Sequence, residues 1–186
     1  MDYIAEKYNK PGAVFLGVVH RLDRPTTGIV VFARTSKALS RLNKLFSERE
    51  TKKIYWAVVE NEPPKASGRL IHYMKRNPKQ NKSYAHANEV PDSKQAILNY
   101  SLIKKLDHYF LLEIDLETGR HHQIRSQLSA IGCIIKGDLK YGAKRSNKDA
   151  SIHLHARTIS FIHPVKKEKL TITAPPPEDS IWRACI

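Results

Sequence analysis

The sequence predicts an α+β fold, with a mainly antiparallel mixed sheet and flanking helices. One observation is the alternation of apolar and polar residues in short segments such as Lys53–Glu60, which is typical of strands. A second is that Gln95–Lys105 and Tyr109–Leu116 are strand-like and separated by only three residues, which indicates an antiparallel hairpin. A third is a long helical pattern that begins at Thr35-Ser36.

The first part of the chain should contain a helix end, an extended segment and one long helix. Residues 1–19 read as the end of a helix, a Pro11-Gly12 turn and an extended stretch. Thr27-Gly28 is expected to start a strand through Ala33, and Thr35-Ser36 to cap a helix that reaches about Arg49. Its apolar face, which we expect to pack on a sheet, is formed by Leu39, Leu42, Leu45 and Phe46.

The remaining elements alternate between strands, basic loops and short helices. A helix is expected from His121 to Ile131, ending at Gly132, which suits the residue after a helix. Further strands are predicted at Arg69–Lys75, His153–Ile162 and Lys169–Ala174, and a short helix at Glu178–Ala184. Two basic stretches, Lys75–Lys82 and Lys136–Lys148, are expected to be exposed loops. The first is the loop we would test first for contact with a binding partner, although a charge run is usually only a solvated face.

The charge balance points to a polyanionic partner. The 186 residues hold 32 Lys and Arg against 18 Asp and Glu, a net charge of +14. Such an excess favours RNA or DNA over a neutral metabolite. A membrane surface would require a basic amphipathic segment or a lipidation signal, and the sequence has neither.

Length and cysteine usage predict one domain over residues 1–186 and a cytoplasmic location. The sequence has no apolar run near the ~20 residues of a membrane span and no signal-peptide pattern at its start. Cys133 and Cys185 make neither a disulfide framework nor a zinc spacing. His121-His122 and His153-x-His155 lack a matching carboxylate or thiol pattern, so we expect polar contacts from them and no metal.

The most informative stretch is His20–Gly28, which reads HRLDRPTTG. Asp23 lies between Arg21 and Arg24, whose charges favour the ionised carboxylate and could meet a phosphate backbone. An ionised carboxylate there suits nucleophilic chemistry on a nucleotide. Equally, Asp23 could simply cap a turn by accepting backbone N–H groups. The stretch does not fit a kinase catalytic loop, because that loop reads H-R-D and its fold needs a glycine-rich phosphate loop.

HRLDRPTTG closely resembles the catalytic signature of the RluA-type RNA pseudouridine synthases, and the other signatures of that family follow in order. They are KIYWAVV at Lys53–Val59, GRHHQIR at Gly119–Arg125, GDLKYG at Gly137–Gly142, and HLHA at His153–Ala156 ahead of Phe161–Pro164. The resemblance covers about residues 18–175. It implies the synthase catalytic fold and an enzyme that isomerises specific uridines in ribosomal or transfer RNA, with no cofactor or metal.

By this resemblance, Asp23 is the catalytic Asp, Arg125 its basic partner, and Tyr55 the active-site tyrosine. A bidentate Arg125 guanidinium would orient Asp23 and keep it charged, while the Tyr55 ring could stack on uracil. Without the family, Arg125 would be an exposed helix residue and Tyr55 a core aromatic. Candidate RNA contacts are Arg21, Arg24, Arg120, His121, His122 and Gln123.

The chain departs from the family pattern at a few positions and at its front. Thr27 replaces the commoner Ser, Gln127 stands where His is frequent, and Cys133-Ile134 where His-Pro is frequent. Only 19 residues precede His20, fewer than the family usually has, and no S4-like domain is recognisable. A missing strand would expose a sheet edge and favour instability or self-association.

Two alternative functions stay open from the sequence. One is a non-catalytic RNA-binding protein derived from this fold, disabled by its short front. The other, which is weaker, is a phosphodiesterase or nuclease, which would need a metal cluster or a pair of histidines serving as acid and base.

Overall fold

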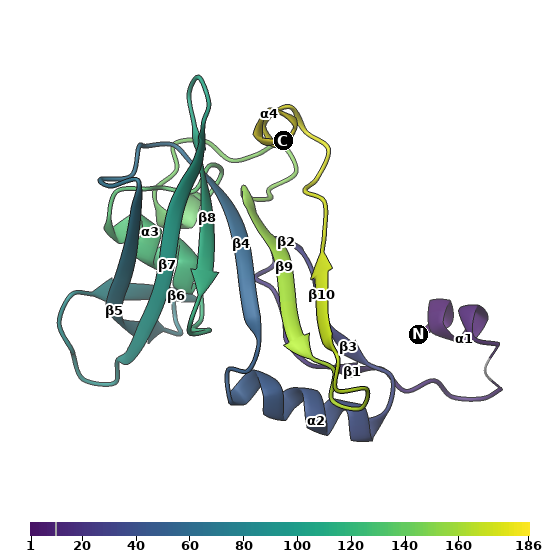
Figure 1. The fold of residues 1–186 in the computed structure, drawn as a ribbon. Helices are drawn as coiled ribbons and strands as arrows, with labels where there is room; N and C mark the ends of the chain where they lie inside the picture. Colours follow the sequence, from purple (N-terminus) through teal and green to yellow (C-terminus); the bar gives the residue numbers. More distant parts are fainter. Residues whose placement is uncertain (10) are drawn as a thin grey trace.

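A computed structural model describes residues 1–9 and 11–186 (Figure 1). The elements in chain order are α1 Asp2–Lys7, β1 Gly17–Val18, β2 Thr27–Gly28, β3 Phe32–Ala33, α2 Ser36–Ser47, β4 Lys52–Val59, β5 Ser67–Asn77, β6 Lys82–His86, β7 Lys94–Lys105, β8 Phe110–Leu116, α3 Gln123–Ala130, the 3-10 helix η1 Leu139–Tyr141, β9 Leu154–Ile162, β10 Lys169–Thr173 and α4 Ser180–Cys185.

The main sheet has the strand order β10-β9-β4-β8-β7-β5-β6, with β2 attached to β9. Its neighbours pair antiparallel along this path, including the β7–β8 hairpin and the β9–β10 pair. Among the strands of the described residues, only β2 runs parallel to its partner, with Thr27 opposite His155 and Gly28 opposite Ala156. The prediction of an α+β fold with a mainly antiparallel mixed sheet is confirmed.

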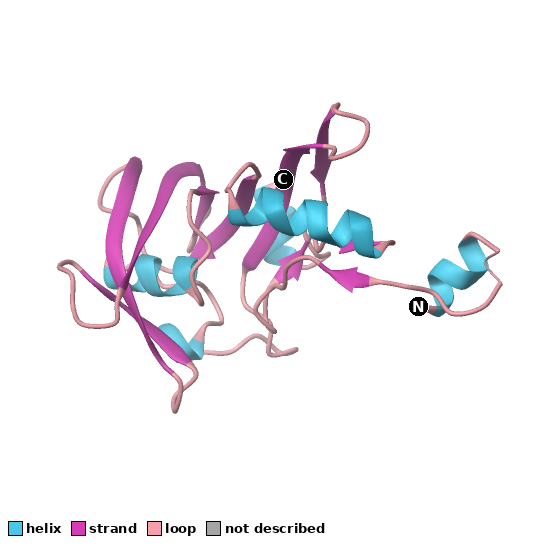
Figure 2. Ribbon diagram, turned by 90° about the horizontal axis from the view of Figure 1, so that it is seen from below, coloured by secondary structure: helices cyan, strands magenta, loops and turns pink. Residues whose placement is uncertain are grey.

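Three helices cover different parts of this sheet. α3 lies alongside β5 to β8, where Ile124 and Leu128 join the largest apolar cluster (Figure 1). Viewed from below, α2 lies across the strands at one end of the sheet (Figure 2), and its Leu42 packs with Ile159 and Phe161. α4 places Trp182 in a third apolar cluster, next to β4 and β8. No helix in the described residues is long and apolar enough to cross a bilayer.

The helix predicted after Thr35 forms as expected. The Thr35 hydroxyl accepts a hydrogen bond from the Ala38 N–H at 3.1 Å and so satisfies one of the free donors of the first turn. The apolar residues then recur on one face, and that face is the one that packs toward β9. Local sequence signals were sufficient here because cap, periodicity and burial all agree.

Three predicted boundaries were wrong. The strand expected from Thr27 to Ala33 is split, because β2 pairs with β9 whereas β3 pairs with β1. The helix expected at His121 begins at Gln123, since His122 has a left-handed backbone with φ 53°. Half of the loop expected at Lys75–Lys82 is strand: β5 and β6 pair up to Asn77 and Lys82, which leaves a four-residue turn between them.

Candidate active site

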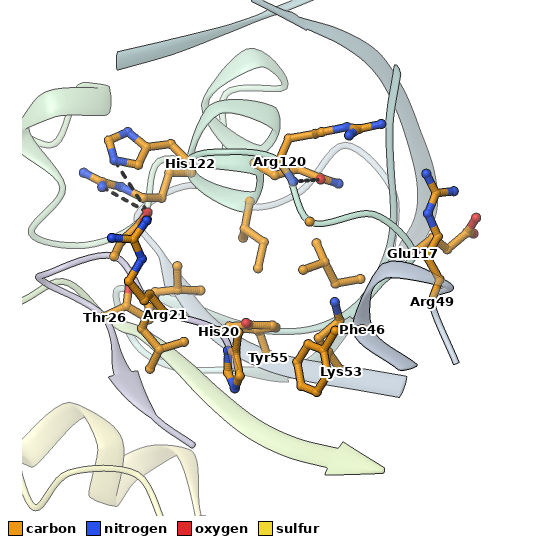
Figure 3. A pocket seen from close by; sticks show the side chains of 18 of the residues that line it. His20, Arg21, Thr26, Phe46, Arg49, Lys53, Tyr55, Glu117, Arg120 and His122 are labelled. Atoms are coloured by element: carbon orange, nitrogen blue, oxygen red, sulfur yellow. Dashed lines mark hydrogen bonds and ion pairs between the residues drawn. The ribbon is translucent and has the colours of Figure 1, made fainter. Parts of the chain in front are cut away.

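A cavity of about 460 Å³ opens where the His20–Gly28 turn meets α2, β4 and the start of α3 (Figure 3). Polar and charged side chains dominate its lining. They come from four separated segments and include His20, Arg21, Asp23, Arg49, Lys53, Tyr55, Arg120, His122 and Arg125. The HRLD, KIYWAVV and GRHHQIR motifs therefore converge on one place, although they lie far apart in the sequence.

The turn that carries Asp23 is fixed to β9 through its backbone. The Thr26 N–H donates to the Asp23 carbonyl at 2.8 Å and closes the turn. Gly28 has φ +113°, and a Cβ at this position would lie 2.4 Å from the Ala156 carbonyl oxygen. Only glycine allows this approach. The Thr27 hydroxyl adds a hydrogen bond to His155 Nδ1 at 2.9 Å, so the hydroxyl that replaces the family's serine is used.

Arg125 lies beneath Asp23 and is almost completely buried. Its Nη1 donates to Asp23 Oδ2 at 3.3 Å, so the structure brings the two residues together across 102 positions of sequence. The bidentate contact, however, is made with Asp138: Nε to Oδ2 at 2.7 Å and Nη2 to Oδ1 at 2.8 Å. The expectation of a bidentate Arg125–Asp23 pair was wrong, because Asp138 occupies the fork of the guanidinium.

The charge of Arg125 is secured by these two carboxylates. Burial alone would lower the pKa of Arg125, but the hydrogen bonds and charge of Asp138, together with Asp23, raise it above its ordinary value. Asp138 is 1 % exposed and would be costly to bury without this partner. Among the described residues, Asp23 forms an ion pair with Arg125 and lies close to His122, and neither Arg21 nor Arg24 pairs with it.

His122 approaches the same carboxylate oxygen as Arg125. Its Nε2 is 3.7 Å from Asp23 Oδ2, and its Nδ1 is 3.0 Å from the Tyr141 hydroxyl. Burial, followed by the charges of Arg125 and His121, lowers the pKa of His122 to about 3, so the ring is neutral at pH 7. His121 stacks on it with ring centroids 3.8 Å apart and contacts the Ser83 hydroxyl.

Tyr55 projects from β4 into the cavity (Figure 3). Burial, with the charge of Asp23, raises the pKa of Tyr55 to about 12. The hydroxyl therefore stays protonated at neutral pH and is available as a donor, not as a phenolate base. The ring forms part of the cavity wall as well as packing against the main apolar cluster.

The remaining candidate RNA contacts fall into two groups. Arg21 is exposed and lines the cavity, and Arg24 is exposed outside it. Arg120 lines the cavity while its Nε donates to the Gln95 carbonyl at 3.0 Å. Gln123 is buried, and its amide is bonded within the protein: Oε1 accepts from Thr118 Oγ1 at 2.8 Å and from the Arg120 N–H at 2.9 Å. Gln123 thus holds the segment before α3 in place.

Comparison with known families identifies this constellation. A family described as RNA pseudouridylate synthase matches residues 2–130, which include Asp23, Tyr55 and Arg125. The chain belongs to the RNA pseudouridylate synthase family. The cavity is therefore the one in which the synthase motifs of this chain meet.

Several curated members of the RNA pseudouridylate synthase family are similar to this chain. An uncharacterised RNA pseudouridine synthase of Chloroflexus aurantiacus is 40% identical over 164 residues, covering 88% of this chain and 51% of that protein. Ribosomal large subunit pseudouridine synthase D of Zymomonas mobilis is 31% identical, covering 88% of this chain and 53% of that protein. Synthase C of Buchnera aphidicola is 33% identical, covering 92% and 55%. The chain spans about half the length of these relatives.

Solved structures of the family share the fold. Human RNA pseudouridylate synthase domain containing 1 superposes with a TM-score of 0.76 at 23% identity, covering 96% of this chain and 75% of that one. Human RNA pseudouridylate synthase domain containing 4 superposes with a TM-score of 0.73 at 24% identity, covering 90% of this chain and 74% of that one.

Sequence reasoning missed two residues of this synthase site. Asp138 and Tyr141 lie in the GDLKYG motif, within a stretch interpreted as an exposed basic loop, yet both are buried. The signal was the single acidic residue and the aromatic between glycines of a recognised motif. The described residues contain no group of three His, Cys, Asp or Glu side chains that could hold a metal ion.

Proposed function

We propose that this chain isomerises specific uridines in ribosomal or transfer RNA to pseudouridine, with Asp23 as the essential carboxylate. One observation carries the proposal: Asp23 lines a cavity of about 460 Å³ and its Oδ2 is held by the buried Arg125 at 3.3 Å. The relatives named ribosomal large subunit pseudouridine synthases support ribosomal RNA as the substrate class.

The reaction breaks the bond between uracil N1 and the ribose, turns the base and rejoins it through C5. The two oxygens of Asp23 are not equivalent: both of its side-chain contacts in the described chain use Oδ2. Oδ1 is thus the oxygen left to meet the nucleotide. Attack on the ribose, attack on the base and removal of a ribose proton are all consistent with this geometry, because each uses an ionised carboxylate beside the flipped nucleotide.

The target nucleotide must first leave its stack, which costs a few kcal/mol in a helix and less in a loop. Arg21 and Arg120 lie at the cavity and Arg24 beside it, where their charges would bind the flanking phosphates. The neutral Tyr55 would stack on the uracil and donate a proton during the rearrangement. RNA is the only partner that the proposal requires, and action on ribosomal or transfer RNA implies a cytoplasmic location.

The test follows tritium release from RNA labelled at uracil C5, since that hydrogen is lost when C5 joins the ribose. The wild-type chain should release tritium, and Asp23→Asn should reduce the rate by on the order of 10³-fold. Asp107→Asn, in the exposed β7–β8 turn, is the matched control and should release at the wild-type rate. Undiminished release by Asp23→Asn would remove Asp23 from its proposed role.

A wild-type chain that binds RNA in a salt-sensitive way but releases no tritium would contradict catalysis. That result would favour the alternative of a non-catalytic RNA-binding protein, whose affinity falls with salt because binding releases counterions.

A further inference from the structure

The buried hydroxyl of Tyr141 lies at a branch point of hydrogen bonds next to the site. It accepts from the Ser83 N–H at 2.9 Å. Two acceptors are also within its reach: the Ser83 carbonyl oxygen at 3.1 Å and His122 Nδ1 at 3.0 Å. A tyrosine hydroxyl has one proton, so Tyr141 can donate to only one of these two atoms.

The Ser83 carbonyl does not need that proton. It already accepts a hydrogen bond from the Ser126 hydroxyl at 3.0 Å. If the Tyr141 proton went to Ser83 nonetheless, His122 would have to donate from Nδ1 to Tyr141. Because the ring is neutral, its Nε2 would then carry a lone pair.

The position of Nε2 decides between the two arrangements. Nε2 faces Asp23 Oδ2 at 3.7 Å, and the dashed line at His122 in Figure 3 marks this approach. A lone pair aimed at a carboxylate is repelled, whereas an N–H dipole aimed at it is attracted. The low dielectric around a buried ring strengthens both effects. The proton on Nε2 is therefore favoured, with Nδ1 as the acceptor.

We propose that Tyr141 donates to His122 Nδ1 and so fixes the tautomer in which His122 presents Nε2–H to Asp23. The catalytic consequence of this tautomer rests on the function proposed above. Tyr141 is then a positioning residue that acts through His122, and Asp23 Oδ2 has two donors, Arg125 and His122. The distance of 3.7 Å is longer than a hydrogen bond, and we expect it to shorten when a nucleotide enters the cavity.

The surroundings hold both rings in place for this role. The Arg125 guanidinium lies 5.0 Å from the centre of the Tyr141 ring, and Lys82 Nζ lies at the same distance. Burial raises the pKa of Tyr141 to about 12, which keeps its proton on the oxygen. On the other side, His121 stacks on His122.

The test is ¹⁵N NMR of the histidine rings in the full chain at pH 7, without RNA. The two-bond coupling pattern identifies which ring nitrogen carries the proton, and a His122→Gln spectrum assigns the His122 signals by difference. The proposal requires protonated Nε2 and a hydrogen-bonded, unprotonated Nδ1. A protonated Nδ1 on His122 in the wild-type chain would overturn it. The protonation state is read from the wild-type spectrum, and the variant serves only to assign the signals.

Tyr141→Phe then tests the donor. In this variant the His122 Nδ1 resonance should move toward that of a nitrogen without a hydrogen bond. An unchanged resonance would contradict Tyr141 as the donor. Tritium release should lose about 5- to 10-fold in kcat with little change in KM, as for the loss of one hydrogen bond. Tyr100→Phe, which is about as buried as Tyr141, is the control and should change neither the His122 resonance nor kcat. An inactive wild-type chain would refute the proposed function and leave the tautomer result standing.

Discussion

The two halves of the site are held by different forces. The half built by α3 and the segment around η1 places Arg125 and Asp138 in the interior, with exposed side-chain fractions of 5% and 1%. The half that carries Asp23 is a turn between two-residue strands, and its carboxylate is 27% exposed. Buried charge pairing fixes the first half, whereas backbone contacts with β9 fix the second. Asp23, the proposed reactive group, thus lies on the less buried part, and its partner Arg125 on the more buried part.

The largest expected effect comes from breaking the buried half. Asp138→Asn leaves the buried Arg125 guanidinium without its main counter-charge, so the free energy of unfolding should fall by about 3–5 kcal/mol. Urea unfolding measures this. Asp115→Asn, which removes an exposed pair with Lys52 at 3.5 Å, should cost less than about 1 kcal/mol. If the two variants were equally stable, the buried pair would not be what fixes this half.

The turn is tested by closing the space at Gly28. Gly28→Ala forces a Cβ against the Ala156 backbone at φ +113°, and we expect a loss of about 3 kcal/mol together with most of the activity. Gly132→Ala is the matched control, because it also has a positive φ, +79°, but nothing lies within 4 Å of the added atom. A Gly28→Ala chain as stable and active as Gly132→Ala would show that the approach to β9 does not position Asp23.

Acid should weaken the buried half through His122. The pKa of His122 is lowered to about 3 in the folded chain, chiefly by burial, against about 6.5 when unfolded. Between pH 6.5 and pH 3 only the unfolded chain therefore binds a proton at His122. The contribution of His122 to the free energy of unfolding is full above pH 6.5 and falls as the pH is lowered below that value. At pH 5 this effect of His122 alone should lower the free energy of unfolding by about 2 kcal/mol.

Urea unfolding at pH 7.5 and pH 5 measures the slope of the free energy of unfolding with pH. His122→Gln should flatten it, and His108→Gln, in the exposed β7–β8 turn, should not. An equal slope in all three chains would mean that His122 is not kept neutral by its surroundings.

The smallest expected effect is at Thr27. Thr27→Val removes the hydroxyl that contacts His155 Nδ1 at 2.9 Å but keeps the branched shape, so it should cost about 1 kcal/mol. Thr158→Val removes an exposed contact with the Thr173 hydroxyl on β10 and is the control. A smaller loss for Thr27→Val than for Thr158→Val would show that this hydrogen bond does not help to hold the turn.

The sequence predicted what depends on local signals. The α2 helix follows from the Thr35 cap and its apolar spacing, and the β7–β8 hairpin from two alternating segments around a short turn. The division of the 27–33 segment could not be predicted in this way, because it results from the parallel pairing of Gly28 with Ala156, which lies far along the chain.

The site was predicted unevenly for the same reason. Asp23, Tyr55 and Arg125 were identified through family motifs, and the structure places all three at one cavity. Asp138 was missed because the stretch around it is rich in lysine, and composition does not reveal that one carboxylate turns inward. The bidentate hydrogen bonds of the Arg125 guanidinium were accordingly assigned to Asp23, whereas they are made with Asp138.

The occupation of the Arg125 fork also sets how charge is distributed through the cavity. Beside Asp23, two carboxylates surround one guanidinium, so this cluster carries a net charge of −1 with His122 neutral. Elsewhere in the lining, the cations Arg21, Arg49, Lys53 and Arg120 outnumber the other carboxylate, Glu117. A phosphate would be retained by these cations and repelled from the cluster beside Asp23, whereas an uncharged nucleoside meets no such repulsion. The cavity would therefore sort the parts of one nucleotide by charge, which orients the nucleotide before any bond is broken.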